Sequence, residues 1–90
     1  MKTDKFKNLR YRLMEVETWP LDYMFKFIVP NNEDKVDRVK ALLPQNGTFS
    51  FKHTSNLKHV SVTCVAQMKS ADEIIDITEK VDAIEGVLAL

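Results

Sequence analysis

Residues 21–29, LDYMFKFIV, alternate between two kinds of side chain, and this alternation decides the fold. Successive side chains of a β-strand point to opposite faces, so one face of this strand would carry a bulky apolar set and the other a mixed set. The apolar set is Leu21, Tyr23, Phe25, Phe27 and Val29, and the mixed set is Asp22, Met24, Lys26 and Ile28. We expect the aromatic face to pack beneath helices and the mixed face to stay open.

The segment after this strand predicts a helix. Pro30 and Asn31 end the strand, and Asn32 is a typical N-cap because its side chain accepts a hydrogen bond from a free N–H group of the first helical turn. Apolar side chains then recur at helical spacing. They indicate a buried stripe formed by Val36, Val39, Leu42 and Leu43.

Two strands joined as a hairpin are expected next. Residues 47–54 and 57–67 both alternate, and the Ser-Asn pair at residues 55–56 favours a turn. Phe49 and Phe51 share one face of the first strand, which we expect to point toward the helices. On the second strand the same side is expected to carry Val60, Val62, Cys64 and Ala66.

A second helix follows the hairpin. Ser70 and Glu73 form a capping box, in which each side chain satisfies a free N–H group at the start of a helix. The apolar stripe of this helix is expected to be Ile74, Ile77, Val81 and Ile84. Gly86 is a natural helix end, and residues 87–90 predict a short edge strand.

The resulting order is strand, helix, strand, strand, helix, strand. This order predicts an α+β, ferredoxin-like βαββαβ sandwich, with a four-stranded antiparallel sheet and two helices on one face. The helical spacing of Phe6, Leu9 and Leu13 predicts an additional short amphipathic helix, from about Asp4 to Glu15. We therefore expect a helical extension over residues 1–18 and one ferredoxin-like domain over residues 19–90.

Composition excludes several classes of protein. The 90 residues suffice for one domain, and 44% hydrophobic with 29% charged residues is ordinary for a packed chain. The single cysteine, Cys64, cannot form an internal disulfide, and two glycines cannot build a glycine-rich phosphate loop. No apolar run is long enough for a membrane span or a signal peptide, so we expect a cytoplasmic protein. We also expect no cofactor and no metal.

Charge is zero overall but unevenly distributed. Residues 1–12 carry five basic side chains and one acidic, and residues 38–69 carry five basic side chains and none that are acidic. Residues 70–90 carry six acidic side chains and one basic. Such polarity is able to steer an anion or a second copy toward one side of the domain, although a plainly solvated surface is the simpler reading.

A catalytic role for Cys64 is not favoured by its position. Its place in the alternation puts Cys64 on the helix-covered side, whereas His59 points the other way and His53 lies across the hairpin. A metal site at the two histidines would need at least one more ligand. We expect a buried structural cysteine and no enzyme activity.

The open face of the sheet is the expected place for a partner or ligand. Its apolar side chains, among them Met24, Ile28 and Val65, favour contact with a protein partner or a second copy, through this face or an edge strand. An alternative is a sensor for a small carboxylate or phosphate. Its candidate binding residues are Lys26, Ser50, Lys52, Ser61 and Thr63.

RNA binding is less favoured, although the same order of elements serves RNA-recognition modules. Those modules stack bases on aromatic side chains of the two central strands. Here Phe25 and Phe27 share the core-directed face, and residues 60–63 offer no aromatic ring. A net charge of zero also removes most of the attraction to phosphates.

Three stretches of the chain resemble the YbeD-like family of small bacterial proteins of unknown function. They are Trp19-Pro20, the strand from Tyr23 to Pro30, and the strand from Lys58 to Ala66. Lys26 corresponds to the family's lysine in the first strand, residues 52–58 to its Ser/Lys-rich hairpin, and residues 60–63 to its Val-Ser-x-Thr strand.

This resemblance extends from Trp19 to Leu90. It implies a ferredoxin-like fold similar to ACT ligand-sensing domains. It also implies a regulatory role.

Overall fold

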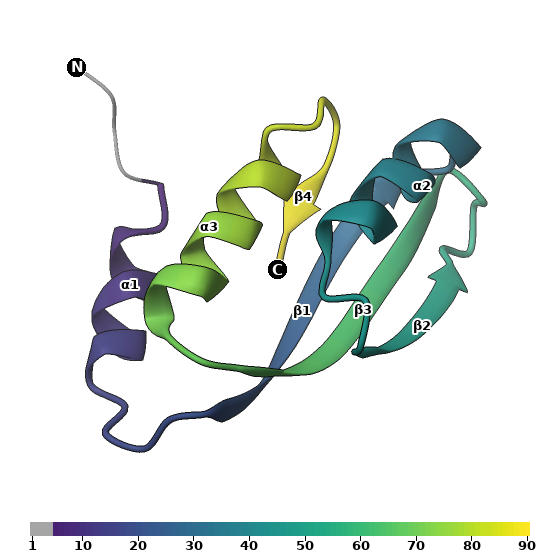
Figure 1. Ribbon diagram of the computed structural model, residues 1–90. Coiled ribbons are helices and arrows are strands. Elements are labelled where there is room, and N and C mark those ends of the chain that lie inside the picture. Colours follow the sequence, from purple (N-terminus) through teal and green to yellow (C-terminus); the bar gives the residue numbers. More distant parts are fainter. Residues whose placement is uncertain (1–4) are drawn as a thin grey trace.

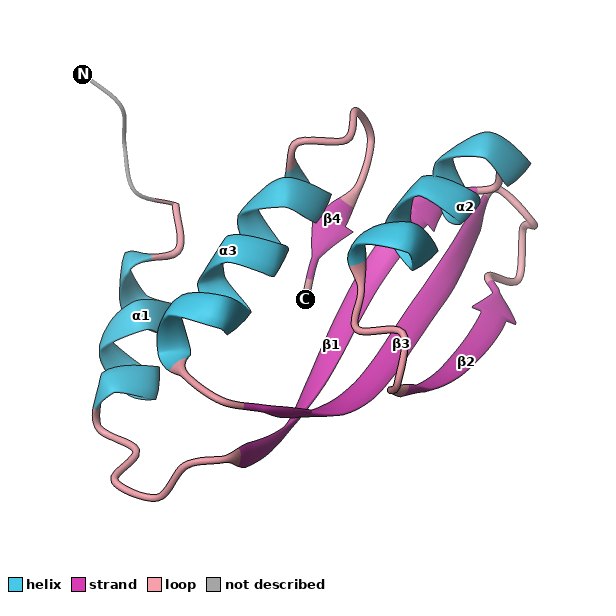
Figure 2. Cartoon of the chain, in the orientation of Figure 1, coloured by secondary structure: helices cyan, strands magenta, loops and turns pink. Residues whose placement is uncertain are grey.

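The computed structural model describes residues 5–90, which form one antiparallel sheet with α2 and α3 packed on one face and α1 beside α3 (Figure 1). The elements, in chain order, are α1 (Lys7–Met14), β1 (Leu21–Pro30), α2 (Glu33–Leu42), β2 (Thr48–His53), β3 (His59–Met68), α3 (Ala71–Asp82) and β4 (Leu88–Ala89). The strand order is β2-β3-β1-β4, so β1 and β3 are central and β2 and β4 are edges (Figure 2). The predicted α+β, ferredoxin-like class is confirmed.

The core lies between the sheet and the helices. Phe25, Phe27 and Val29 of β1 are at most 2% exposed, and their partners on β3 in the antiparallel register are Cys64, Val62 and Val60. From the helical side the core receives Val39, Leu43, Ile74, Ile75 and Val81. Burial of each such side chain contributes about 1.5 to 3 kcal/mol, so the predicted face of β1 is one of the main contributors to stability.

Both predicted N-caps are present. The Asn32 side chain accepts a hydrogen bond from the backbone N–H of Lys35 at 3.1 Å, and Ser70 Oγ accepts one from the N–H of Glu73 at 3.2 Å. Each cap contributes about 1 kcal/mol and fixes where its helix begins.

The apolar stripe of α2 is narrower than the sequence predicts. Val39 and Leu43 are buried as predicted, but Leu42, the last residue of the helix, is 36% exposed. Leu43, at the C-cap, is 2% exposed, so the buried stripe continues past the end of the helix without Leu42.

Phe51 lies on the predicted face of β2 but is not buried there. It points to the helical side of the sheet but is 45% exposed, because β2 is an edge strand and α2 packs on β1. The helix therefore leaves the outer edge of β2 uncovered.

Element boundaries shift by a few residues. The first helix begins at Lys7, and its predicted start at Asp4 lies outside the described residues. Strand β3 begins at His59, two residues later than predicted, because Leu57 adopts a φ of 59° in the hairpin turn. The side-chain amide of Asn31 donates to the Leu57 carbonyl at 2.7 Å and holds this turn against the end of β1.

Candidate functional site

The side of the sheet that faces away from the helices, the open sheet face, brings together all five predicted anion-binding residues. In the register, Lys26 lies opposite Thr63, and Thr63 lies opposite Ser50, which makes one row across three strands. The next row places Ser61 opposite Lys52. Side chains directly opposite on one face lie about 5 Å apart at Cβ, so Thr63 has Lys26 on one side and Ser50 on the other, and Ser61 neighbours Lys52.

Apolar side chains flank these two rows. Met24 and Val65 lie opposite each other and are 59% and 38% exposed, and Leu88 of β4 lies opposite Ile28. The open sheet face is therefore a shallow surface of mixed polarity.

Helix α1 is held against α3 by charge and by one buried side chain. Lys5 Nζ lies 3.0 and 3.1 Å from the two carboxylate oxygens of Asp82, and Arg10 lies 3.6 Å from both Asp72 and Glu79. Leu13 is 5% exposed and belongs to the core. Part of the basic N-terminal segment is thus paired with the acidic C-terminal segment inside one molecule.

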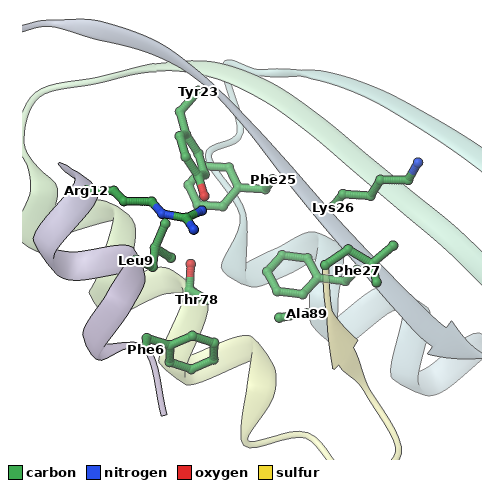
Figure 3. Close-up of a pocket in the computed structure, with 10 residues that line it drawn as sticks. Phe6, Leu9, Arg12, Tyr23, Phe25, Lys26, Phe27, Thr78 and Ala89 are labelled. Carbon is green, nitrogen blue, oxygen red and sulfur yellow. The ribbon is translucent and has the colours of Figure 1, made fainter. Parts of the chain in front are cut away.

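The docking of α1 creates a cavity of about 260 Å³, the α1 cavity, bounded by α1, β1, α3 and the C-terminal residues. Phe6 and Leu9 form its wall on α1, and Phe27 and Ala89 lie across from them (Figure 3). Lys26 also lines this space, but its side chain runs away from it in Figure 3. The cavity is therefore mainly apolar.

Three polar side chains enter the α1 cavity. Arg12 and Tyr23 point toward one another across it, and the Thr78 hydroxyl points in from α3 (Figure 3). Thr78 is 4% exposed, and its Oγ1 donates to the Ile74 carbonyl at 2.8 Å. Burial raises the pKa of the Tyr23 hydroxyl above its ordinary value, so this group stays protonated and able to donate at neutral pH.

Sequence reasoning missed Arg12, Tyr23 and Thr78 as members of one site. One signal was present, because Phe6, Leu9 and Arg12 are spaced three residues apart and so share a helix face. The position of that face against β1 and α3 depends on the tertiary fold.

A second hollow, of about 270 Å³, lies between α2 and the edge strand β2. The Phe51 ring lines it and stacks on the Phe49 ring at a centroid distance of 6.1 Å and an interplanar angle of 5°. Lys40 Nζ lies 5.3 Å from the centroid of the Phe51 ring, within the range of a cation–π interaction. We call this hollow the α2–β2 groove.

The predicted burial of Cys64 is confirmed, since the side chain is fully buried. Its Sγ lies 3.8 Å from the Pro44 carbonyl oxygen, and a Cβ on Gly47 would lie 2.6 Å from Sγ. Burial raises the pKa of the thiol, which disfavours the reactive thiolate. His59 lies on the opposite side of β3, so it does not face the sulfur.

Within residues 5–90, no three His, Cys, Asp or Glu side chains gather into a group suited to a metal ion. No helix in that range has the length and apolar character needed to cross a bilayer.

The order of elements and the sheet order define a small α+β domain of the ferredoxin-like class. A family described as "Protein of unknown function (DUF493)", the YbeD family, matches residues 15–90, and the chain belongs to that family. Helix α1 thus lies outside the matched residues. Neither the curated proteins nor the solved structures gave a match to this chain.

Proposed function

We propose that this chain is a non-catalytic regulatory or protein-interaction module that acts as a homodimer, with the outer edge of β2 as the contact. The observation that carries this proposal is Phe51, a large ring that is 45% exposed on an edge strand beside the α2–β2 groove. Exposed edge strands bearing apolar side chains are a liability unless another strand covers them.

The outer edge of β2 has backbone groups available for such pairing. The Thr54 N–H donates to the His59 carbonyl, so the backbone of Thr54 faces β3. Backbone direction alternates along an antiparallel strand, which turns the N–H and C=O groups of Phe49, Phe51 and His53 away from β3. A second β2 strand can accept and donate at these three positions.

A two-fold pairing centred on Ser50 is complementary to itself. It sets Phe49 opposite the partner's Phe51, and Lys52 opposite the partner's Thr48, with all side chains on their existing faces. Four phenylalanine rings would then cover one another, and the two lysines would not be directly opposed. The zero net charge of the chain adds little repulsion between copies.

A protein contact is supported over an RNA contact by the burial of β1. Phe25 and Phe27 are 2% and 1% exposed, so neither ring is accessible to a base. The remaining exposed side chains of β1 on the open sheet face, such as Met24 and Lys26, offer no stacking surface.

We expect Phe51→Lys to weaken the dimer about tenfold or more, because it replaces two aromatic cross-strand pairs with charge. The measurement is size-exclusion chromatography with light scattering over a concentration series. The matched control is Met24→Lys, which places the same charge on the open sheet face and should leave the dimer intact.

Two outcomes would contradict this proposal. A strictly monomeric wild-type chain would remove the dimer altogether. If Met24→Lys dissociated the dimer and Phe51→Lys did not, the dimer contact would lie on the open sheet face and not at the β2 edge.

A small-anion sensor is the second candidate function, and the two adjacent rows on the open sheet face favour it. Lys26, Thr63 and Ser50 form one row, and Ser61 and Lys52 form the next. Two ammonium groups beside three hydroxyls can donate to a carboxylate or phosphate.

The sensor predicts a rise in melting temperature with inorganic phosphate or succinate. Saturation at 100 times Kd adds about 2.7 kcal/mol, or about 10 °C or more in a domain of this size. Lys26→Ala with Lys52→Ala should abolish the rise, whereas the control pair Lys58→Ala with Lys69→Ala should retain it. An equal shift in both double variants would rule these rows out as the site.

A further inference from the structure

The α1 cavity, which is partly open to solvent, brings together a cationic group, hydroxyl groups and aromatic walls. Arg12 enters from α1, Tyr23 from β1 and Thr78 from α3, while Phe6 and Phe27 supply apolar surface (Figure 3). Small-molecule sites are typically apolar pockets with a few placed polar groups, which is the composition found here.

Arg12 differs from Lys5 and Arg10, and also from Lys7, whose Nζ lies 5.9 Å from the centroid of the Tyr11 ring. Lys5 and Arg10 pair with carboxylates of α3, whereas the Arg12 guanidinium has no carboxylate partner among residues 5–90. It is an exposed side chain at the rim of the apolar α1 cavity. A guanidinium in this position can bind a carboxylate through two parallel hydrogen bonds.

Tyr23 and Thr78 complete the polar end of the cavity. The Tyr23 hydroxyl faces Arg12 and is able to donate a further hydrogen bond (Figure 3). Thr78 Oγ1 already donates to Ile74 and therefore offers only acceptor lone pairs. Donors thus come from Arg12 and Tyr23, which favours an anionic group between them.

The rest of the cavity favours an aromatic ring. Four aromatic side chains line it, and two of them, Tyr23 and Phe25, already meet edge to face at a centroid distance of 4.8 Å. A ligand ring inserted beside Phe6 and Phe27 would extend this arrangement. The volume of about 260 Å³ lies below the range of drug-sized pockets, so it limits the ligand to a single ring with a short arm.

We propose that the α1 cavity binds a small aryl monocarboxylate, with its carboxylate at Arg12 and Tyr23 and its ring against Phe6 and Phe27. The site depends on α1, which lies outside the residues shared with the family. It is separate from the β2 edge. It shares Lys26 with the open sheet face, but that side chain runs away from the cavity and the variants used below leave Lys26 unchanged, so the test is independent of the proposed dimer and sensor.

The test is a titration of the full chain, labelled with ¹⁵N, with 3-phenylpropionate, followed by amide chemical shifts. We expect saturable shifts around the cavity, at Leu9, Thr78 and Ala89, and little change at Ser61 and Thr63 on the open sheet face. The uncharged analogue 3-phenylpropionamide should bind more weakly by about tenfold or more, since a hydrogen bond to a charged group is lost.

Arg12→Gln should weaken binding of 3-phenylpropionate about tenfold or more and leave binding of the amide nearly unchanged. The matched control is Arg38→Gln, an exposed arginine on α2 away from the cavity. Leu9→Trp, which fills the cavity from its wall, should remove binding of both compounds while the amide spectrum stays dispersed.

Three results would overturn the proposal. They are the absence of saturable shifts, equal affinity of Arg12→Gln and the wild-type chain, and shifts centred on the open sheet face. The oligomeric state of Arg12→Gln, measured in parallel, keeps this result distinct from failure of the dimer.

Discussion

Phe27→Ala is expected to lower the free energy of unfolding by about 3 to 5 kcal/mol, whereas Met24→Ala on the same strand should change it by about 0.5 kcal/mol. Phe27 is 1% exposed and packs beneath the helices, so truncation removes a buried ring and leaves a cavity. Met24 is 59% exposed on the open sheet face, so most of its surface is already in water. Because a domain of this size has a stability of about 5 to 15 kcal/mol, the first loss is a large share of the total.

Urea unfolding followed by circular dichroism measures both changes. Equal losses for the two variants would mean that the two faces of β1 are not distinguished by burial. That result would also indicate that the Phe27 ring is exposed, and base stacking on β1 would then be a realistic function.

The fold was predictable because its signals are local. The alternation of residues 21–29 assigns every side chain of β1 to a face, and the caps at Asn32 and Ser70 mark where α2 and α3 begin. Right-handed crossovers then leave few ways to order four strands. These patterns involve residues that are close in sequence, so they can be recognised without the tertiary structure.

The exposure of Phe51 was not predictable from the same signals. Alternation gives the face of a residue correctly, but it does not say how far a helix extends over the sheet. Phe51 lies on the predicted face, yet α2 packs on β1 and leaves the outer edge of β2 open. An edge strand therefore needs the position of the covering helix before burial can be assigned.

The α1 cavity was missed for a related reason. Its polar groups come from Arg12, Tyr23 and Thr78, which lie on three elements and up to 66 positions apart in the numbering. The two rows of the open sheet face, in contrast, follow directly from strand register. Sites formed by register can be found from sequence, whereas sites formed by helix docking require the docked geometry.

Leu13→Ala is expected to cost about 2 to 5 kcal/mol of the free energy that holds α1 on the domain. Arg10→Gln removes the two ion pairs to α3, but their distances of 3.6 Å and the exposure of Asp72 limit the loss to about 1 kcal/mol. We therefore expect burial of Leu13 to contribute more than these two ion pairs to the docking of α1.

Limited proteolysis with trypsin distinguishes these contributions, because α1 contains Lys7, Arg10 and Arg12. Leu13→Ala should speed cleavage after Lys7 and Arg10 while residues 15–90 remain intact, and the control Met14→Ala, at an exposed position, should not. If cleavage after Lys7 were faster in Arg10→Gln than in Leu13→Ala, the ion pairs of Arg10 would hold α1 more strongly than burial of Leu13 does. Since α1 forms one wall of the cavity, Leu13→Ala should also reduce binding of 3-phenylpropionate in proportion to the undocked fraction, although Leu13 does not line the site.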